Sequence, residues 1–497
     1  MLSLLIFLPA AVAAVLLLAK VPGRAALWVW LGTALATVAI AVGAWTAYLA
    51  GAGPGADGYG FETKVKWIPG VGSSYHVGVD GLSLPLLTLT TVVFTATAIY
   101  SLREADRPRS YAALFLALET TSLGLFAALD LIVFFVFFDL SIVGMYFVIA
   151  GWGHGARRRR SALLFFLYTF VGSLALLLGF IGLYVAAEPH TFDIVALAAH
   201  PPLTGSGLAG PLVLAAIALG LAIKTPTVPF HTWLPPAHTD APAAGSAVLA
   251  GILLKMGTFG FVRIAMPLLP DQWRAYAWGF VAVGVVSVLY GALVALAQDN
   301  FKRLVAFTSV NHMGYILLAL GAAGLVGDDR ARAVAVTGAV TQMVSHGLIT
   351  AALFLLAGVL FDRGGSYDMN RYGGLAGPAP RFAAVTAIAA FASLGLPGFS
   401  GFIAEFQILA GSLGPATPAA AVAALGIVLT AGLFLLALHR LFLGAPRAPA
   451  AIADLGPREL WATVPLLAAS VLIGVYPQSL LAVVTPAAHT LITLVSR

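Results

Sequence analysis

Long apolar stretches separated by short polar loops follow one another along almost the whole chain. A helix needs about 20 predominantly apolar residues to cross a bilayer, so stretches of this length predict transmembrane helices. The expected spans are 2–19, 26–50, 80–102, 110–128, 131–150, 161–187, 208–229, 241–266, 273–297, 301–323, 333–360, 381–410, 418–443 and 460–485. The predicted fold is therefore an all-α polytopic membrane protein with about 14 transmembrane helices.

Two of these spans contain helix breakers. The seventh includes LAIKTPTVPFHTWLPPAHTDAP, in which Pro226 and Pro229 follow Lys224, and the twelfth includes ASLGLPGFSGFIAEFQIL, with Pro397 and Gly398. Proline removes a backbone donor and clashes with the preceding helical turn. Because spans five apart run in opposite directions, broken helices 7 and 12 predict two inverted five-helix repeats, an arrangement typical of transport proteins. The expected units are 1–109 (helices 1–3), 110–266 (first repeat, helices 4–8), 267–443 (second repeat, helices 9–13) and 444–497 (helix 14).

Composition supports a membrane protein and excludes several kinds of chemistry. Of the 497 residues, 60% are hydrophobic and 9% are charged, whereas soluble domains carry about 25% charged residues. The sequence has no Cys, which excludes disulfides, thiolate-bound iron–sulfur clusters and cysteine zinc sites. It also has no Walker or Rossmann fingerprint. We therefore expect no cofactor and no metal of its own.

Lys and Arg are concentrated in the loops that follow spans 1, 3, 5, 9, 11 and 13, among them Lys302 and the arginines at 157–160. Cytoplasmic loops of membrane proteins carry an excess of these residues. These loops are therefore predicted to be cytoplasmic, with both termini outside a bacterial-type inner (cell) membrane. On this interpretation the net charge of +6 is a topology signal, and no nucleic-acid partner is expected.

Seven spans each place one ionisable residue near the middle of the bilayer. These residues are Glu119, Asp139, Lys224, Lys255, His312, His346 and Glu405. A charged residue at the bilayer centre costs roughly 2.5–3.5 kcal/mol on insertion scales, and such residues usually mark ion or proton pathways. Any single one, above all Glu119 or a histidine, has the alternative interpretation of a packed, hydrogen-bonded polar group. Together they favour a proton relay.

The pairing of a carboxylate with a buried lysine suggests how such a relay operates. Burial lowers the pKa of an amine, and a neighbouring carboxylate raises it again. We therefore expect Asp139 to control whether Lys224 keeps its proton or passes it towards Lys255. Breaks at Pro226 and Pro229 would let water and polar backbone reach this depth.

Several runs of sequence resemble the antiporter-like proton-channel subunits of respiratory NADH:quinone oxidoreductase (complex I). They include YHVGVDGLSLPLL, AIKTPTVPFHTWLPPAH, AGILLKMGTFGFVR, QDNFKRLVAFTSVNHMG, SHGLITAALFLLAG and LPGFSGFIAEFQIL, and they extend from about residue 75 to residue 442. Within the family they are most similar to the branch called subunit M, or subunit 4 in mitochondria. The resemblance implies a proton-translocating membrane-arm subunit without a redox site, coupled to remote quinone reduction. It also implies L-like, N-like and small K-like membrane subunits as partners in the lipid bilayer.

The resemblance also implies roles for individual residues. Lys224 matches the lysine that pairs with a carboxylate in span 5, Lys255 matches the central relay, and Glu405 matches the exit residue. His312 and His346 match the connecting histidines. Glu405 favours subunit M, because the sibling subunits and the sodium/proton antiporter relatives usually carry Lys at that place.

Several positions depart from the family pattern, among them Gly144, Pro236 and Asp240. Asp139 stands where Glu is usual, and Leu164 stands where a lysine is often found. Because Asp is one methylene shorter, we expect a longer or water-bridged contact between Asp139 and Lys224. Three alternatives stay open at this point: a multi-subunit sodium/proton antiporter, the membrane arm of a hydrogenase-type complex, and a scaffold that has lost conduction.

Overall fold

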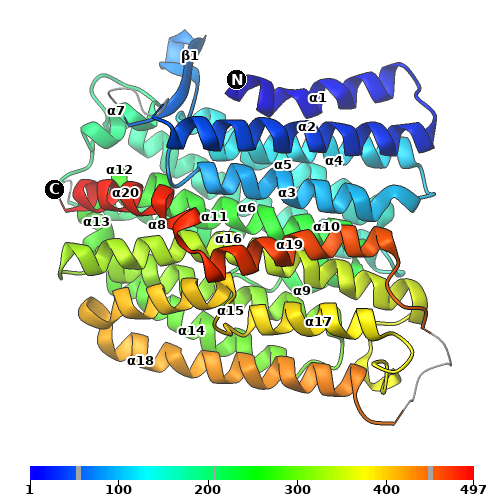
Figure 1. Ribbon diagram of the computed structural model, residues 1–497. Helices are drawn as coiled ribbons and strands as arrows, with labels where there is room; N and C mark the ends of the chain where they lie inside the picture. The colour runs from blue at the N-terminus through cyan, green and yellow to red at the C-terminus, as the bar shows by residue number, and fades with distance from the viewer. Residues whose placement is uncertain (52–57, 206, 446–451, 497) are drawn as a thin grey trace.

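The computed structural model describes residues 1–51, 58–205, 207–445 and 452–496, which form a bundle of long helices lying along one common direction (Figure 1). Within these residues, twelve helices are long and apolar enough to cross a membrane. Three shorter apolar helices accompany them: α1 (Leu2–Leu18), α8 (Ala209–Lys224) and α17 (Pro380–Ser393). The predicted all-α multi-pass fold is confirmed, whereas the number fourteen and the inverted repeats stay predictions.

The remaining elements follow in chain order. The first part of the chain contains α2 (Gly23–Leu49), β1 (Gly60–Ile68), η1 (Pro69–Val71), β2 (Ser73–Val79), α3 (Leu84–Tyr100), η2 (Ser101–Arg103), α4 (Pro108–Ala127), α5 (Leu131–Trp152), α6 (Arg158–Ala186) and α7 (Ile194–Ala199). The middle part contains α9 (Leu234–Asp240), α10 (Ala243–Val248), η3 (Leu249–Leu253), α11 (Leu254–Gly260), η4 (Phe261–Ala265), α12 (Met266–Leu268), α13 (Pro270–Ala275) and α14 (Ala277–Leu296). The last part contains α15 (Phe301–Gly324), α16 (Asp329–Gly364), η5 (Met369–Arg371), α18 (Ser400–Phe442), α19 (Pro457–Val475) and α20 (Gln478–Val495).

Both predicted helix breaks are present. Helix α8 ends at Lys224, and a turn that contains Pro226 and Pro229 leads into α9. Helix α17 ends at Ser393, and a connection that contains Pro397 and Gly398 leads into α18. A helix end leaves backbone carbonyls without intrahelical partners. At the first break, the indole Nε1 of Trp233 satisfies one of them by donating to the carbonyl of Ile223 at 2.9 Å.

The centre of the bundle is made by three long segments. The continuous helical segment from α10 to α12 and helix α15 are buried along their whole apolar windows, and α16 is buried along nearly all of its window. Within the first segment, η3 and η4 are π-helical and flank α11 on both sides. Single π-helical turns inside α-helices occur frequently at functional sites. The irregular backbone therefore directs attention to α11.

The C-terminal part corrects two predictions. The single helix expected at 460–485 is wrong: α19 and α20 are separated at Tyr476, which has φ −126° and ψ 73° and precedes Pro477. A residue before proline is pushed out of the helical region, which explains the break. The spans expected at 381–410 and 418–443 share the single helix α18, which is kinked at Ala416. Of the predicted unit 444–497, residues 446–451 and 497 lie outside the described residues.

A β-hairpin that the sequence analysis missed lies at the same end of the bundle as α7 and the C-terminus (Figure 1). Strands β1 and β2 pair antiparallel, and a charged cluster attaches them to the segment before α7. His76 contacts Asp193 at 2.8 Å and Glu62 at 2.7 Å, and Lys64 contacts Asp193 at 2.6 Å. The hairpin is therefore held by hydrogen bonds that depend on the charge of His76.

This cluster predicts a pH-dependent hairpin. Burial lowers the pKa of His76, but Asp193 and Glu62 outweigh it, and the pKa lies above its ordinary value. A histidine whose pKa is higher in the folded protein than in the unfolded chain stabilises the folded protein fully at pH values below its pKa in the unfolded chain. This stabilisation is lost as the pH rises through its pKa in the folded protein. Proteolytic cleavage within 60–79 should therefore accelerate as the pH rises above the ordinary histidine pKa of about 6.5, and His76→Gln should remove that dependence. An unchanged pH dependence in the variant would show that another group controls the hairpin.

Candidate functional site

Lys255 lies in α11 at the centre of the bundle and is fully buried. Its Nζ donates to the carbonyl of Ala250, which belongs to the π-helical segment η3, and lies 2.6 Å from Nδ1 of His346 on α16. No ion pair with a carboxylate is found for Lys255 within the part of the chain that the structure describes. The amine is thus held by one carbonyl and one imidazole, and the imidazole is itself able to accept a proton.

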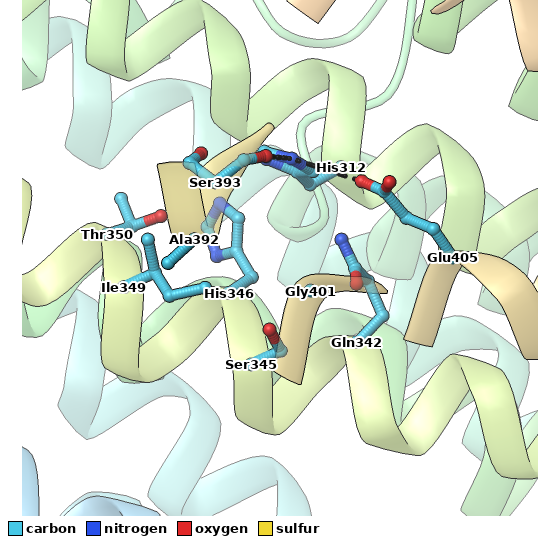
Figure 2. A pocket seen from close by; sticks show the side chains of 10 residues that line it. All are labelled: His312, Gln342, Ser345, His346, Ile349, Thr350, Ala392, Ser393, Gly401 and Glu405. Carbon is cyan, nitrogen blue, oxygen red and sulfur yellow. Dashed lines mark hydrogen bonds and ion pairs between the residues drawn. The ribbon is translucent and has the colours of Figure 1, made fainter. Parts of the chain in front are cut away.

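The contact with His346 continues through two further ionisable residues (Figure 2). The rings of His346 and His312 on α15 have centroids 5.3 Å apart. Nε2 of His312 lies 3.2 Å from the carbonyl oxygen of Ser393 and 3.8 Å from Oε1 of Glu405. The structure therefore brings four predicted residues into one line that crosses four helices: Lys255, His346, His312 and Glu405.

A small polar cavity adjoins this line of residues. Figure 2 shows the side chains that line it, which include both histidines, Glu405, Gln342 and Ser345. Nε2 of His346, Nδ1 of His312 and Oε1 of Gln342 are buried and have no hydrogen-bond partner among the described residues. Buried polar groups are almost always hydrogen-bonded, to protein or to ordered water. A cavity of this size and lining is suited to a single water molecule that bridges the gap between the imidazole rings.

The predicted pair of Asp139 and Lys224 is close but not in direct contact. Nζ of Lys224, the last residue of α8, donates to Oγ of Ser141 at 3.0 Å and lies 4.8 Å from the ring centre of Phe138. Among the described residues, no ion pair within 4.0 Å joins Asp139 to Lys224, and Oδ1 of Asp139 has no hydrogen-bond partner. The lysine is fully buried, whereas Asp139 is only partly buried. This spacing corresponds to the longer contact expected for Asp in place of Glu.

Glu119 lies apart from the other predicted residues. It is fully buried in α4, and its Oε1 accepts a hydrogen bond of 2.7 Å from Oγ1 of Thr37 on α2. Its Oε2 has no partner among the residues that the structure describes. The structure therefore does not connect Glu119 to the line that begins at Lys255.

Two buried groups were not among the predicted site residues. His238 was noted only as part of a motif, yet it is fully buried and both of its ring nitrogens lack a partner in the described structure. Lys302 was counted with the basic loops, yet it is the second residue of α15 and is also fully buried. Its place at the edge of a predicted span was the available signal, but a span edge alone does not show whether a side chain points outwards or inwards.

The described residues contain no group of three or more His, Asp or Glu side chains arranged to hold a metal ion. The groups that are present are an amine, two imidazoles and a carboxyl group, each able to gain or lose a proton. Such an arrangement can pass protons between helices.

Residues 128–433 match a family model described as NADH:quinone oxidoreductase/Mrp antiporter, TM. The chain belongs to this family. NADH-quinone oxidoreductase subunit M of Rhodobacter capsulatus is 36% identical over 509 residues, which cover 99% of this chain and 96% of that protein. NAD(P)H-quinone oxidoreductase chain 4 1 of Picosynechococcus sp. is 37% identical over 468 residues, which cover 92% of this chain and 85% of that protein. The predicted likeness to subunit M is confirmed.

Solved structures of the family agree with this assignment. A chain of respiratory complex I from Thermus thermophilus with bound NADH matches with a TM-score of 0.89 and 31% identity, and the match covers 100% of both chains. A chain of the Mrp complex from Dietzia sp. matches with a TM-score of 0.87 and 24% identity over 99% of this chain and 98% of that chain. The second likeness shows that the fold is shared.

Proposed function

We propose that this chain is a proton-translocating membrane-arm subunit of a complex I-type NADH:quinone oxidoreductase. The observation that carries this proposal is the buried line from Lys255 through His346 and His312 to Glu405. Ionisable side chains inside a membrane protein are expensive, and they are retained where they form proton pathways. The curated relatives described above are named as subunits of NADH- or NAD(P)H-quinone oxidoreductases. The antiporter and hydrogenase-type alternatives are therefore weaker.

The geometry suggests how a proton crosses the centre of the subunit. Protonated Lys255 donates to Nδ1 of His346, which receives the proton as the amine becomes neutral. Water in the adjoining cavity passes a proton on to His312, and His312 passes one to Glu405. Each group returns to its starting state when it is reprotonated by the group before it or deprotonated by the group after it.

Lys224 and Asp139 supply the control step in this proposal. The positive charge of Lys224 is held near the partly buried carboxylate of Asp139, with Ser141 as its direct partner. A movement that changes the distance between the two charges changes the proton affinity of the lysine. The turn after α8 provides the break at which such a movement can occur.

The subunit has no oxidation–reduction step of its own in this proposal. Electron transfer takes place in other subunits, and the chain serves the enzyme as its proton-conducting part. L-like, N-like and small K-like membrane subunits and the lipid bilayer are its neighbours. The loops that carry most of the lysines and arginines face the cytoplasm of a bacterial-type cell.

The test is Lys224→Ala in membrane vesicles that contain the intact complex. We expect donor-driven quinone reduction and proton uptake to fall together by about tenfold or more, because a positioned proton-transfer group typically contributes a factor of ~10² or more. Arg159→Ala, at an exposed position at the start of α6, is the matched control and should behave as wild type. Wild-type rates in Lys224→Ala would mean that the lysine is dispensable and would favour a scaffold that no longer conducts.

A further inference from the structure

Three buried serine hydroxyls form a hydrogen-bonded chain beside the cavity between His346 and His312. Oγ of Ser345 on α16 lies 2.7 Å from Oγ of Ser400, the first residue of α18, and Oγ of Ser400 lies 2.7 Å from Oγ of Ser470 on α19. At most 1% of each serine is exposed. Figure 2 shows Ser345 in the cavity lining. The chain therefore leads from α19, across the start of α18, to the cavity.

The hydrogen bonds within this chain leave one donor over, and this donor is at the cavity end. The backbone N–H of Ser400 donates to Oγ of Ser470 at 3.3 Å, so the Ser470 hydroxyl donates back to Oγ of Ser400, whose own hydroxyl donates to Ser345. In the reverse order the hydrogen of Ser470 would have no acceptor among the described residues, which is costly for a buried hydroxyl. The hydroxyl hydrogen of Ser345 is thereby left to point into the cavity.

The chain is fixed at its far end by the packing of α19. One turn after Ser470, the backbone of Gly474 lies directly against Gly398 in the break before α18, where a Cβ at position 474 would overlap backbone atoms. The start of α19 is joined to the end of α16 by an ion pair of 2.6 Å between Glu459 and Arg363. The distance between the serines of α19 and α18 is therefore set by rigid neighbours.

Each of the two imidazoles in the cavity lining has one nitrogen without a partner in the part of the chain that the structure describes. Nδ1 of His346 accepts from the ammonium group of Lys255, so its unpartnered Nε2 carries the ring hydrogen. Nε2 of His312 lies 3.2 Å from the carbonyl oxygen of Ser393, which can only accept, so its unpartnered Nδ1 is an acceptor. The lining thus contains one free ring donor and one free ring acceptor.

Gln342 supplies a fourth group. It lies one turn before Ser345 on α16 and lines the same cavity, and its Oε1 is buried and has no partner within the described ranges. The donors are therefore the Ser345 hydroxyl and Nε2–H of His346, and the acceptors are Oε1 of Gln342 and Nδ1 of His312. A buried water molecule makes two to four hydrogen bonds. One water molecule in this cavity would satisfy all four groups at once.

We propose that the serine chain positions a single water molecule that carries protons from His346 to His312. The proposal rests on the proposed function and deepens it by assigning Ser345, Ser400 and Ser470 to the pathway as positioning residues. The chain starts at a backbone N–H in the first turn of α18, which has no carbonyl partner within the helix. Hydrogen bonds in a chain polarise one another, so the last hydroxyl is a stronger donor than an isolated serine.

The water molecule takes part in a balanced proton transfer. Protonated Lys255 gives a proton to Nδ1 of His346, and Nε2 of that ring then releases its hydrogen to the water oxygen. The water gives one of its own hydrogens to Nδ1 of His312, so His346 is neutral, His312 carries the positive charge and the water is regained. Its new hydrogen points back towards His346, and the water must turn before the next transfer. The Ser345 hydroxyl holds the oxygen in place while the molecule turns.

The test measures donor-driven quinone reduction and proton uptake together in vesicles that contain the intact complex. Ser400→Ala breaks both links of the chain and should lower proton uptake by about tenfold, because a positioned proton transfer contributes a factor of ~10² or more and three partners of the water remain. Ser400→Thr keeps a hydroxyl and should restore most of the uptake, whereas Ser470→Ala should show a smaller loss. Ser412→Ala is the matched control, because Ser412 lies on the same helix and is buried without a hydrogen-bond partner among the described residues. Wild-type uptake in Ser400→Ala would overturn the proposal.

A second measurement does not depend on how much of each variant folds. The ratio of the uptake rates in H₂O and D₂O should rise in Ser400→Ala, because transfer through a poorly held water becomes the slow step. The ratio should stay at its wild-type value in Ser412→Ala. Reduced uptake in Ser400→Ala with an unchanged ratio would show that the serines only support the packing of α16, α18 and α19, and would also overturn the proposal.

Lys255→Met, measured in the same vesicles, separates the serine chain from the proposed function. A loss of uptake in Lys255→Met together with wild-type behaviour of Ser400→Ala and Ser470→Ala would overturn the role of the serine chain alone. Wild-type uptake in Lys255→Met would overturn the proposed function itself.

Discussion

Lys255→Met is expected to reduce proton uptake by the intact complex by about 10²-fold or more, because it removes the proton donor that faces His346. Quinone reduction coupled to that uptake should fall with it. Methionine has nearly the length of lysine and no charge, so it fits the fully buried site at little cost to packing. The measurement is simultaneous recording of quinone reduction and proton uptake in vesicles.

The matched control for this prediction is Met256→Leu, which changes the shape of the next buried residue without touching a titratable group. It should retain uptake close to wild type. If Met256→Leu were as impaired as Lys255→Met, packing within α11 would explain both results. The proton-donor role of Lys255 would then have no support from this experiment.

Arg263→Met is expected to destabilise the subunit by about 3–5 kcal/mol, because removing one partner of a buried ion pair leaves the other charge uncompensated. Nη2 of Arg263 lies 2.6 Å from Oδ1 of Asp80, and their side chains are only 6% and 13% exposed. Burial alone would raise the pKa of Asp80, but the guanidinium outweighs it, and the pKa of that carboxyl lies below its usual value. The measurement is the thermal unfolding temperature of the solubilised complex and the amount of the chain in membranes.

The compensating variant tests the cause of this loss. Arg263→Met combined with Asp80→Asn removes both charges, and Asn can still accept the hydrogen bonds that Asp80 receives from the backbone N–H groups of Leu82 and Ser83. Most of the stability should return, because replacing both partners is far less costly than replacing one. A double variant as unstable as Arg263→Met would show that the Arg263 side chain matters through its packing and its contact with Tyr59.

The sequence by itself was sufficient for the features that depend on short-range patterns. Apolar stretches of bilayer length predicted the spans, and Pro226, Pro229, Pro397 and Gly398 predicted the two broken helices that the structure shows. The break before Pro477 follows from the same chemistry, yet the apolar pattern around it runs on without interruption and hid it. The β-hairpin was missed because its two strands are short beside the long apolar stretches that flank them, and the search for bilayer-length stretches passed over them.

The sequence also placed seven ionisable residues at similar depths, because depth within a helix follows from position along it. It could not decide which of them meet, because that depends on the rotation and packing of helices far apart in the chain. The tertiary structure connects Lys255 to His346, 91 positions away, and leaves Glu119 with Thr37. The same packing buries Lys302, which the sequence placed with the exposed loops, and stacks the buried ring of His238 on Phe354 of α16. Composition and spacing thus determined that ionisable groups lie inside the membrane, and only helix packing decided which of them lie next to one another.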